Sequence, residues 1–200
     1  MNTRRLLEWG GLAASVVLIV FGAAALYMGF DGRSTVQDSL KQEQIYFGDA
    51  SDPAVAKYAS QWAGQQVTTG DQARAFAKIM RTHTLESSGN LTYAQMGRFQ
   101  SAANPSDQKG TNDEAAAAKD STGQPIANGA RNLWVTETAL STALNTSFFA
   151  EQVAMFGLVV GVAFLLAGIG FAILAFTAFR WLPARELEAA KAPVGVPQPV

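Results

Sequence analysis

The residues best suited to chemistry in this chain centre on its single histidine, His83, which lies three residues before Glu86. On a helix, residues three apart share a face, so the imidazole and the carboxylate could hold one metal ion together. A stable site needs three or four ligands, and the neighbouring sequence supplies no others. We therefore predict no metal and no cofactor. The simpler interpretation of His83 is a polar contact on an otherwise apolar helix face.

Other catalytic patterns are equally sparse. A Ser–His–Asp triad would have to use His83, and the chain has no Gly-x-Ser-x-Gly turn that would expose a serine. The pair Asp113–Glu114 falls in a stretch rich in glycine and proline, where no rigid element could position it. The chain contains no cysteine, which excludes disulfides, thiolate metal sites and cysteine nucleophiles. We predict that it is not an enzyme.

Two apolar segments dominate the organisation of the chain. Residues 9–30 carry no charge and, at about 1.5 Å per residue, are long enough to cross the hydrocarbon core of a bilayer. Residues 153–182 carry one charge, Arg180. The first segment could also be a signal peptide cleaved after Ala25, but its apolar run continues to Phe30. We predict an all-α membrane protein, a two-transmembrane-helix hairpin with a small helical extracytoplasmic domain built on extensions of both spans.

The distribution of lysine and arginine predicts the orientation. The cations of the predicted tails, residues 1–8 and 183–200, and of the inner end of the second span are Arg4, Arg5, Arg180, Arg185 and Lys191. Only Arg33 and Lys41 lie close to the spans in the connecting region. Because positive charge is enriched on the cytoplasmic side, both termini are expected in the cytoplasm of a bacterium and residues 31–152 outside its plasma membrane. The proline-rich C-terminal tail is predicted to be disordered.

The connecting region is predicted to be helical at both ends. The first span is expected to continue outward to about Phe47, and the second to begin at about Asn132 and run unbroken to Leu182. Between them, Thr69 and Gln72 have the spacing of a capping box. The helix that they begin is expected to end near Ser87, before Gly89.

Residues 101–129 differ from the rest of the connecting region. They contain one large apolar residue, Ile126, together with several glycines and prolines. Such a segment buries little apolar area to offset the entropy lost on ordering, so it is predicted to be a mobile loop.

Small residues recur at four-residue spacing within both apolar segments. They are Gly157, Gly161, Ala163, Ala167, Gly168, Gly10 and Ala14. Small faces let helix backbones approach closely, and the target is either the other span of this chain or another membrane protein. The predicted partners are thus the lipid bilayer and a membrane protein, which could be a second copy. The formal net charge of -1 gives no footprint for nucleic acid.

The stretch from Ile79 to Met96, which includes His83, Gly89 and Tyr93, resembles a segment of small two-span membrane proteins of actinobacteria. The run from Arg131 to Leu144 and the span around residues 157–170 resemble their second half. Members often carry a label as aromatic ring-opening dioxygenases. Such oxygenases hold non-haem iron with two histidines and a carboxylate, and this chain has one histidine. The resemblance therefore implies the topology and an actinobacterial plasma membrane, without that activity.

Two functions remain open from the sequence. The first is a non-catalytic accessory or structural subunit of a membrane-embedded assembly in the bacterial cell envelope, joined through its small-residue helix faces. The second is an extracytoplasmic ligand-binding or sensing protein, in which Trp62, Trp134 and the His83 face line an apolar pocket. A roomy cavity between the helical extensions would favour the second.

Overall fold

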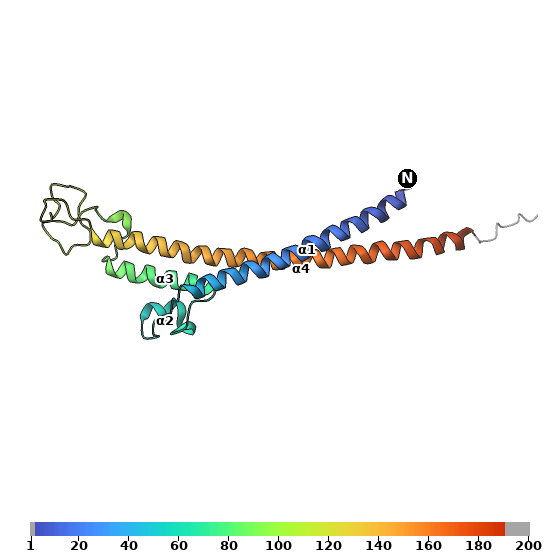
Figure 1. Ribbon diagram of the computed structural model, residues 1–200, viewed down its shortest axis with the longest axis horizontal. Coiled ribbons are helices and arrows are strands. Elements are labelled where there is room, and N and C mark those ends of the chain that lie inside the picture. The colour runs from blue at the N-terminus through green and yellow to red at the C-terminus, as the bar shows by residue number, and fades with distance from the viewer. Residues whose placement is uncertain (1–2, 191–200) are drawn as a thin grey trace, which may run out of the picture. The chain divides into compact units, whose positions relative to one another are not determined.

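The computed structural model describes the backbone of residues 3–190 and the side chains of residues 9–177. Its elements, in chain order, are α1 (Thr3–Gln42), α2 (Pro53–Ala59), the 3-10 turn η1 (Ser60–Trp62), α3 (Gly70–Ser87), the 3-10 turn η2 (Tyr93–Gln95) and α4 (Gly129–Ala190) (Figure 1). No strand occurs between residues 3 and 190, where extended pairing is limited to isolated bridges. The predicted all-α class is confirmed.

The chain divides into two compact units, and the division falls within α1 and α4. The apolar unit comprises residues 1–31 and 154–200, and the polar unit comprises residues 32–153.

In the apolar unit, α1 and α4 run antiparallel and touch through residues that recur every seventh position. On α1 these are Ser15, Gly22 and Gly29, and on α4 they are Ala154, Gly161, Gly168 and Ala175. A Cβ atom on Gly22 would lie 2.8 Å from the backbone nitrogen of Leu165. A seven-residue repeat keeps one line of residues on a helix facing its partner over many turns.

Large side chains fill the space left by these small residues. Leu158 lies over Gly29, and Leu26 lies over Gly161, where an added Cβ would come within 2.8 Å of Leu26 Cγ. Each helix therefore supplies both knobs and holes. We call this line of contacts the seam.

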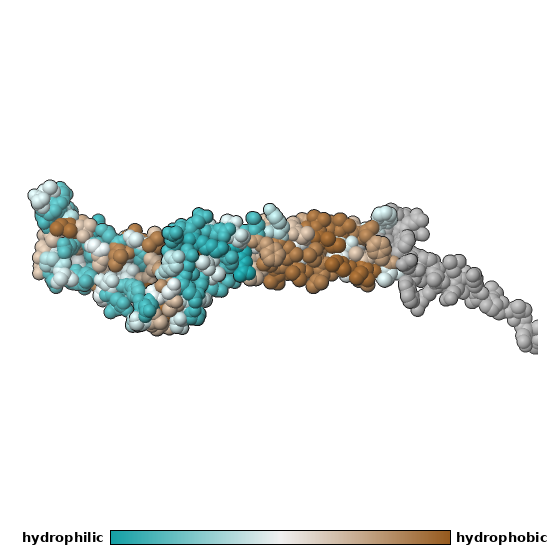
Figure 2. Space-filling view, turned by 60° about the horizontal axis from the view of Figure 1, so that its bottom comes forward, coloured by the Kyte–Doolittle hydropathy of each residue, from teal (hydrophilic) through white to brown (hydrophobic). Residues whose placement is uncertain are grey.

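Away from the seam, the apolar unit exposes large hydrophobic side chains. Examples on the two helices are Phe21 (62% exposed), Phe30 (64%), Phe156 (67%) and Leu166 (67%). Figure 2 shows a continuous brown, hydrophobic area on the surface of the molecule. Both helices are long and apolar enough to cross a membrane. The core helix of a water-soluble protein would bury most of this surface.

The polar unit begins with the last turns of α1 and is organised around α3. The predicted capping box is present, since Thr69 accepts the backbone N–H of Gln72 while the Gln72 side chain accepts the N–H of Thr69. Helix α3 ends at Ser87 as predicted. Asp52 caps α2 by accepting the N–H groups of Ala54 and Val55.

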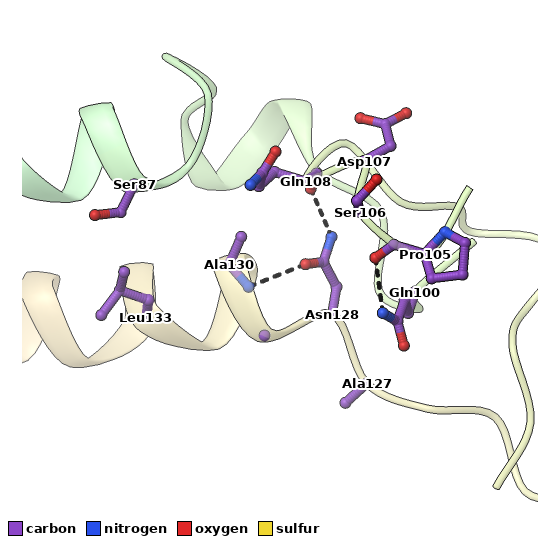
Figure 3. Close-up of a pocket in the computed structure, with 11 residues that line it drawn as sticks. Ser87, Gln100, Pro105, Ser106, Asp107, Gln108, Ala127, Asn128, Ala130 and Leu133 are labelled. Atoms are coloured by element: carbon purple, nitrogen blue, oxygen red, sulfur yellow. Dashed lines mark hydrogen bonds between the residues drawn. The ribbon is translucent and has the colours of Figure 1, made fainter. Parts of the chain in front are cut away.

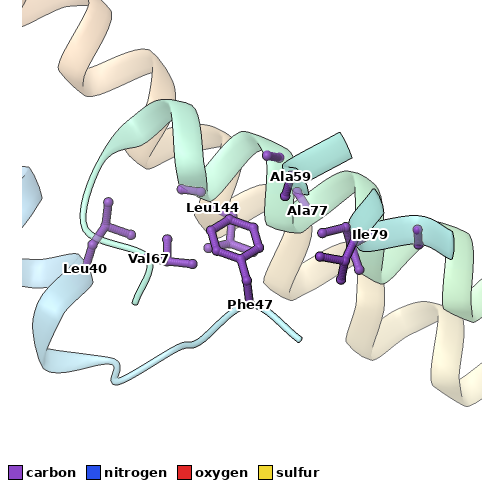
Figure 4. Packing of buried hydrophobic residues seen from close by; sticks show 11 residues of the cluster. Leu40, Phe47, Ala59, Val67, Ala77, Ile79 and Leu144 are labelled. Atoms are coloured by element: carbon purple, nitrogen blue, oxygen red, sulfur yellow. The ribbon is translucent and has the colours of Figure 1, made fainter. Parts of the chain in front are cut away.

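The core of the polar unit is small and rich in alanine (Figure 4). Its buried residues are Leu40, Phe47, Ala54, Val55, Ala59, Val67, Ala73, Ala75, Ala77, Ile79 and Leu144. The alanines of α2 and α3 let these helices approach closely, and the Phe47 ring fills the centre, with Trp62 stacked on it at 5.9 Å between ring centroids. Because α1 ends at Gln42, five residues before the predicted limit, Phe47 lies in an extended segment whose N–H donates to Gln65.

The segment predicted to be a mobile loop, residues 101–129, has a defined backbone hydrogen-bond pattern. Ala102 and Ala118 donate to the carbonyls of Ala116 and Gln100, and Ile126 donates to Ala118. Backbone hydrogen bonds thus order this segment in a way that its few apolar residues do not indicate. Its mobility in solution stays a prediction.

Helix α4 begins at Gly129, three residues before the predicted start, and continues to Ala190, eight residues beyond the predicted end. The predicted disordered tail at residues 183–200 therefore overlaps helix up to Ala190. Its remaining part, residues 191–200, lies outside the described residues, as do the side chains of the tail cations.

Candidate functional site

His83 makes a contact that the sequence did not predict. Its Nε2 lies 3.0 Å from Oδ2 of Asp52, the residue that caps α2. The pair joins the C-terminal half of α3 to the start of α2, and the His83 side chain is 46% exposed. Glu86 does not share this contact, and residues 9–177 contain no group of three possible metal ligands. Through this pair, His83 links α3 to the N-terminal cap of α2.

The two tryptophans proposed to line a pocket with His83 are packed into separate places. Trp62 stacks on Phe47 at the core. Trp134 is buried and donates its Nε1–H to the carbonyl of Leu91, at 2.8 Å, and to Oγ of Ser88, at 3.1 Å. It therefore ties α4 to the segment after α3. The three grooves described among residues 9–177 are lined by other residues than Trp62, Trp134 and His83.

The small residues proposed as an interface divide into two groups. Gly157, Gly161 and Gly168 face the seam within this chain, where they meet residues of α1. Ala163, Ala167, Gly10 and Ala14 are exposed instead. Gly161 and Gly168 belong to the seven-residue repeat of the seam and Gly157 lies three residues after Ala154, a pattern that the four-residue pairs did not reveal.

A buried carboxylate on α4, that of Glu151, connects this helix to α1 and to the start of α3. It accepts hydrogen bonds from Arg33 Nε at 3.0 Å, from Gln37 Nε2 at 3.2 Å and from the backbone N–H of Gly70. These partners come from α1 and from the first residue of α3. A negative charge at a helix N-terminus is favourable, because the N–H groups of the first turn have no partner within the helix.

An apolar groove of about 550 Å³ lies between the end of α1, α3 and α4 in the polar unit. Its lining residues are Ser39, Leu40, Glu43, Ile45, Phe76, Met80, Leu140, Ala143, Leu144 and Ser147. Apolar side chains of α1, α3 and α4 form its walls, while Ser39, Glu43 and Ser147 supply polar groups. Leu140 is 49% exposed, so the groove is open to solvent.

A second, polar groove of about 590 Å³ lies where the loop meets the start of α4 (Figure 3). Asn128 is central to it and is almost fully engaged, because its amide donates to the carbonyls of Gly97 and Gln108 and its oxygen accepts the N–H of Ala130. The Asn128 side chain therefore caps the start of α4 and binds the backbone at Gly97 and, within the loop, at Gln108. We interpret this groove as a consequence of that junction.

A search of protein families, of characterised proteins and of solved structures finds no match to this chain.

Proposed function

We propose that the chain is a two-span protein of the bacterial plasma membrane, with both termini in the cytoplasm and the polar unit outside. The observation that supports this most strongly is the exposed apolar surface on both helices of the apolar unit, exemplified by Phe21 and Leu166. Lipid is the solvent in which such a surface is stable. The seam continues past Ala25 to Gly29, which supports a first span retained in the packed unit over a leader cleaved after Ala25.

The topology is tested by adding protease to intact cells that carry the protein with tags at both ends. We expect cleavage within the loop at residues 101–129 and protection of both tags. Removal of the C-terminal tag from outside would contradict the two-span arrangement, and so would a mature N-terminus after Ala25.

Within this topology we propose a non-catalytic accessory role in a larger membrane assembly. Two buried residues with polar groups in the polar unit hold elements together. Glu151 joins α1, α3 and α4, and Trp134 joins α4 to the segment after α3. The seam occupies one face of α4 and leaves Ala163 and Ala167 on an outward face, where small residues favour contact with another helix.

Photo-crosslinking tests this role. A photoreactive residue placed at Ala163 or Ala167 should capture one defined protein in native membranes. The matched control is the same residue at Leu26, which faces the seam and should crosslink only within the chain. Recovery of lipid adducts alone from the α4 positions, together with a lone monomer in mild detergent, would argue against an accessory role.

The apolar groove favours a second function, binding of a small apolar molecule by the polar unit. Its volume of about 550 Å³ lies within the range of ligand sites. Native mass spectrometry of the protein from its own membranes should then detect a retained molecule that is lost in Leu140→Arg. Identical spectra for wild type and variant would exclude this function.

A further inference from the structure

A third groove lies between α3 and α4 in the polar unit and has a volume of about 350 Å³. One wall is cationic and consists of Arg74, Lys78 and Arg81, with Ala77 between them. The opposite wall is polar, and its residues are Glu137, Thr138, Ser141, Thr142 and Asn145. The groove combines positive charge with hydroxyl and amide groups.

The three cations lie together because they occupy positions i, i+4 and i+7 of α3, which share one helix face. Each lies near an aromatic ring. Arg74 is 4.6 Å from the Phe148 ring centroid, and Arg81 is 5.0 Å from that of Trp134. A guanidinium over a ring is held in place while its N–H groups remain able to donate at its edge. Among the described residues, none of the three cations forms an ion pair.

The one acidic residue of the groove, Glu137, is in no ion pair with these cations among the described residues. Glu137 is 3% exposed, and its carboxylate accepts the hydroxyl of Ser141 at 2.6 Å. Three positive charges and one negative charge leave the groove with an excess of two positive charges. The wider unit has no such excess, since residues 32–153 contain ten Lys or Arg and twelve Asp or Glu.

Tyr58 on α2 lies beside the cationic wall of the groove, and its pKa responds to the cations there. Hydrogen bonding by Lys57 and Thr82, with the charges of Lys57 and Lys78, lowers the pKa of Tyr58. Lys78 lies 5.9 Å from the centroid of the Tyr58 ring. The positive charge therefore extends from the groove toward α2.

We propose that this groove binds a phosphate ester. The three cations line one wall of the groove, and guanidinium groups suit the oxygens of a tetrahedral anion. The hydroxyls of Thr138 and Thr142 supply further donors for the esterified part. The phosphate can belong to a soluble metabolite or to a phospholipid headgroup, and the groove chemistry is the same for both. This inference does not depend on the accessory role.

The test uses the full chain in phosphatidylcholine nanodiscs and titrates glycerol 3-phosphate by calorimetry. A second arm adds phosphatidylglycerol to the discs and measures, by native mass spectrometry, the anionic lipid that remains bound. Binding of glycerol 3-phosphate identifies a soluble source. Retention of phosphatidylglycerol without such binding identifies a headgroup. Neither signal in wild type would overturn the proposal.

Matched variants separate the groove from general surface charge. Arg74→Gln with Arg81→Gln should weaken binding at least about tenfold in whichever arm is positive, because charge-assisted hydrogen bonds are lost. The control, Lys109→Gln with Lys119→Gln, makes the same charge change in the loop and should leave binding unchanged. The second variant, Lys78→Gln, removes one cation, which lies 5.9 Å from the Tyr58 ring centroid. We expect it to weaken binding about threefold. Equal loss in the control would overturn the proposal.

Removing the acidic residue gives an opposite prediction. Glu137→Gln keeps an acceptor for Ser141 and removes the negative charge, so binding should become about three- to tenfold tighter. Glu114→Gln changes the net charge equally but lies in the loop, and it should have little effect. Equal tightening by both would show that binding responds to total charge and would overturn a site in the groove.

Discussion

The carboxylate of Glu151 accepts the backbone N–H of Gly70, the first residue of α3, across 81 residues of sequence. The contact requires the start of α3 to approach α4 closely. A Cβ atom on Gly70 would lie 2.8 Å from both Glu151 Oε2 and Phe148 Cα. Glycine at this position therefore follows from packing, because any larger side chain would push α3 away from the carboxylate.

Gly70→Ala should destabilise the polar unit by about 2 kcal/mol, since overpacking against a backbone atom forces the helices apart. Unfolding of the protein in nanodiscs, followed by tryptophan fluorescence in urea, measures this change. The control is Gly129→Ala at the start of α4, where an added Cβ meets nothing within 4 Å. Equal midpoints for the two variants would contradict the packing argument.

Replacement of Glu151 separates charge from hydrogen bonding. Glu151→Gln retains an acceptor for Gly70 but loses the charge that pairs with Arg33, whose side chain is 42% exposed. Because that exposure screens the pair, we expect a loss of about 1 kcal/mol for glutamine. Alanine also leaves the Gly70 N–H without its acceptor, so a larger loss of about 2–3 kcal/mol is expected. Urea denaturation of both variants measures the difference, and equal losses would show that only the charge matters.

Local features of this fold could be predicted from sequence, whereas the long-range contacts could not. The capping box at Thr69 and the end of α3 at Ser87 depend on residues within a few positions of each other, so the pattern contains the required information. The Glu151 contacts join three separate segments, and no local spacing indicates them. The pairing of His83 with Asp52 was missed for the same reason.

The seam shows a different limit of prediction from sequence, which concerns the partner of a helix face. Gly157 and Gly161 were recognised as small residues suited to helix contact, but the sequence left open whether the partner was internal. The seven-residue repeat through Gly22 and Gly29 on α1, matched on α4, resolves this in the structure. Apolar patterning also does not reveal the hydrogen bond that Trp134 donates to the carbonyl of Leu91.

Stability should depend on pH through Asp52. The pKa of this carboxyl lies below its ordinary value, because the backbone N–H of Ala54 donates to it, with a further contribution from His83. A lowered folded-state pKa stabilises the fold at pH values above the unfolded-state pKa. The contribution is lost as pH falls through the lowered value.

The stability of the polar unit should therefore fall below about pH 4. Asp52→Asn, which can still cap α2, should fall less steeply over this range. Urea midpoints measured between pH 7 and pH 2.5 provide the comparison. Parallel curves for wild type and Asp52→Asn would remove Asp52 as a source of the acid sensitivity.

Trp134 should contribute to stability through its indole N–H as well as its bulk. Trp134→Phe removes the hydrogen bonds to Leu91 and Ser88, and we expect a loss of about 1–2 kcal/mol. Ser88→Ala removes a shared member of the same network, so the double variant should lose less than the sum of the two single changes. Additive losses in urea denaturation would show that the two side chains act independently.

The seam and the outward face of α4 can be distinguished by placing leucine on each. Gly161→Leu adds bulk where even a Cβ would lie within 2.9 Å of the Gly22 carbonyl oxygen. In a membrane no hydrophobic force draws helices together, so association depends on close approach, and this variant should separate α1 from α4. We expect lower abundance and new protease sensitivity. The companion, Ala163→Leu with Ala167→Leu, adds the same kind of bulk to exposed positions of the same helix.

This companion variant should insert and fold normally, because leucine is favourable in lipid. If the outward face contacts a partner, the companion variant should be abundant but should lose the crosslinked protein. Quantitative immunoblotting with protease protection, followed by crosslinking, reads both effects in one set of membranes. A stable Gly161→Leu protein with wild-type protection would contradict the seam. A companion variant that retains its partner would place the interface on a different face of the protein.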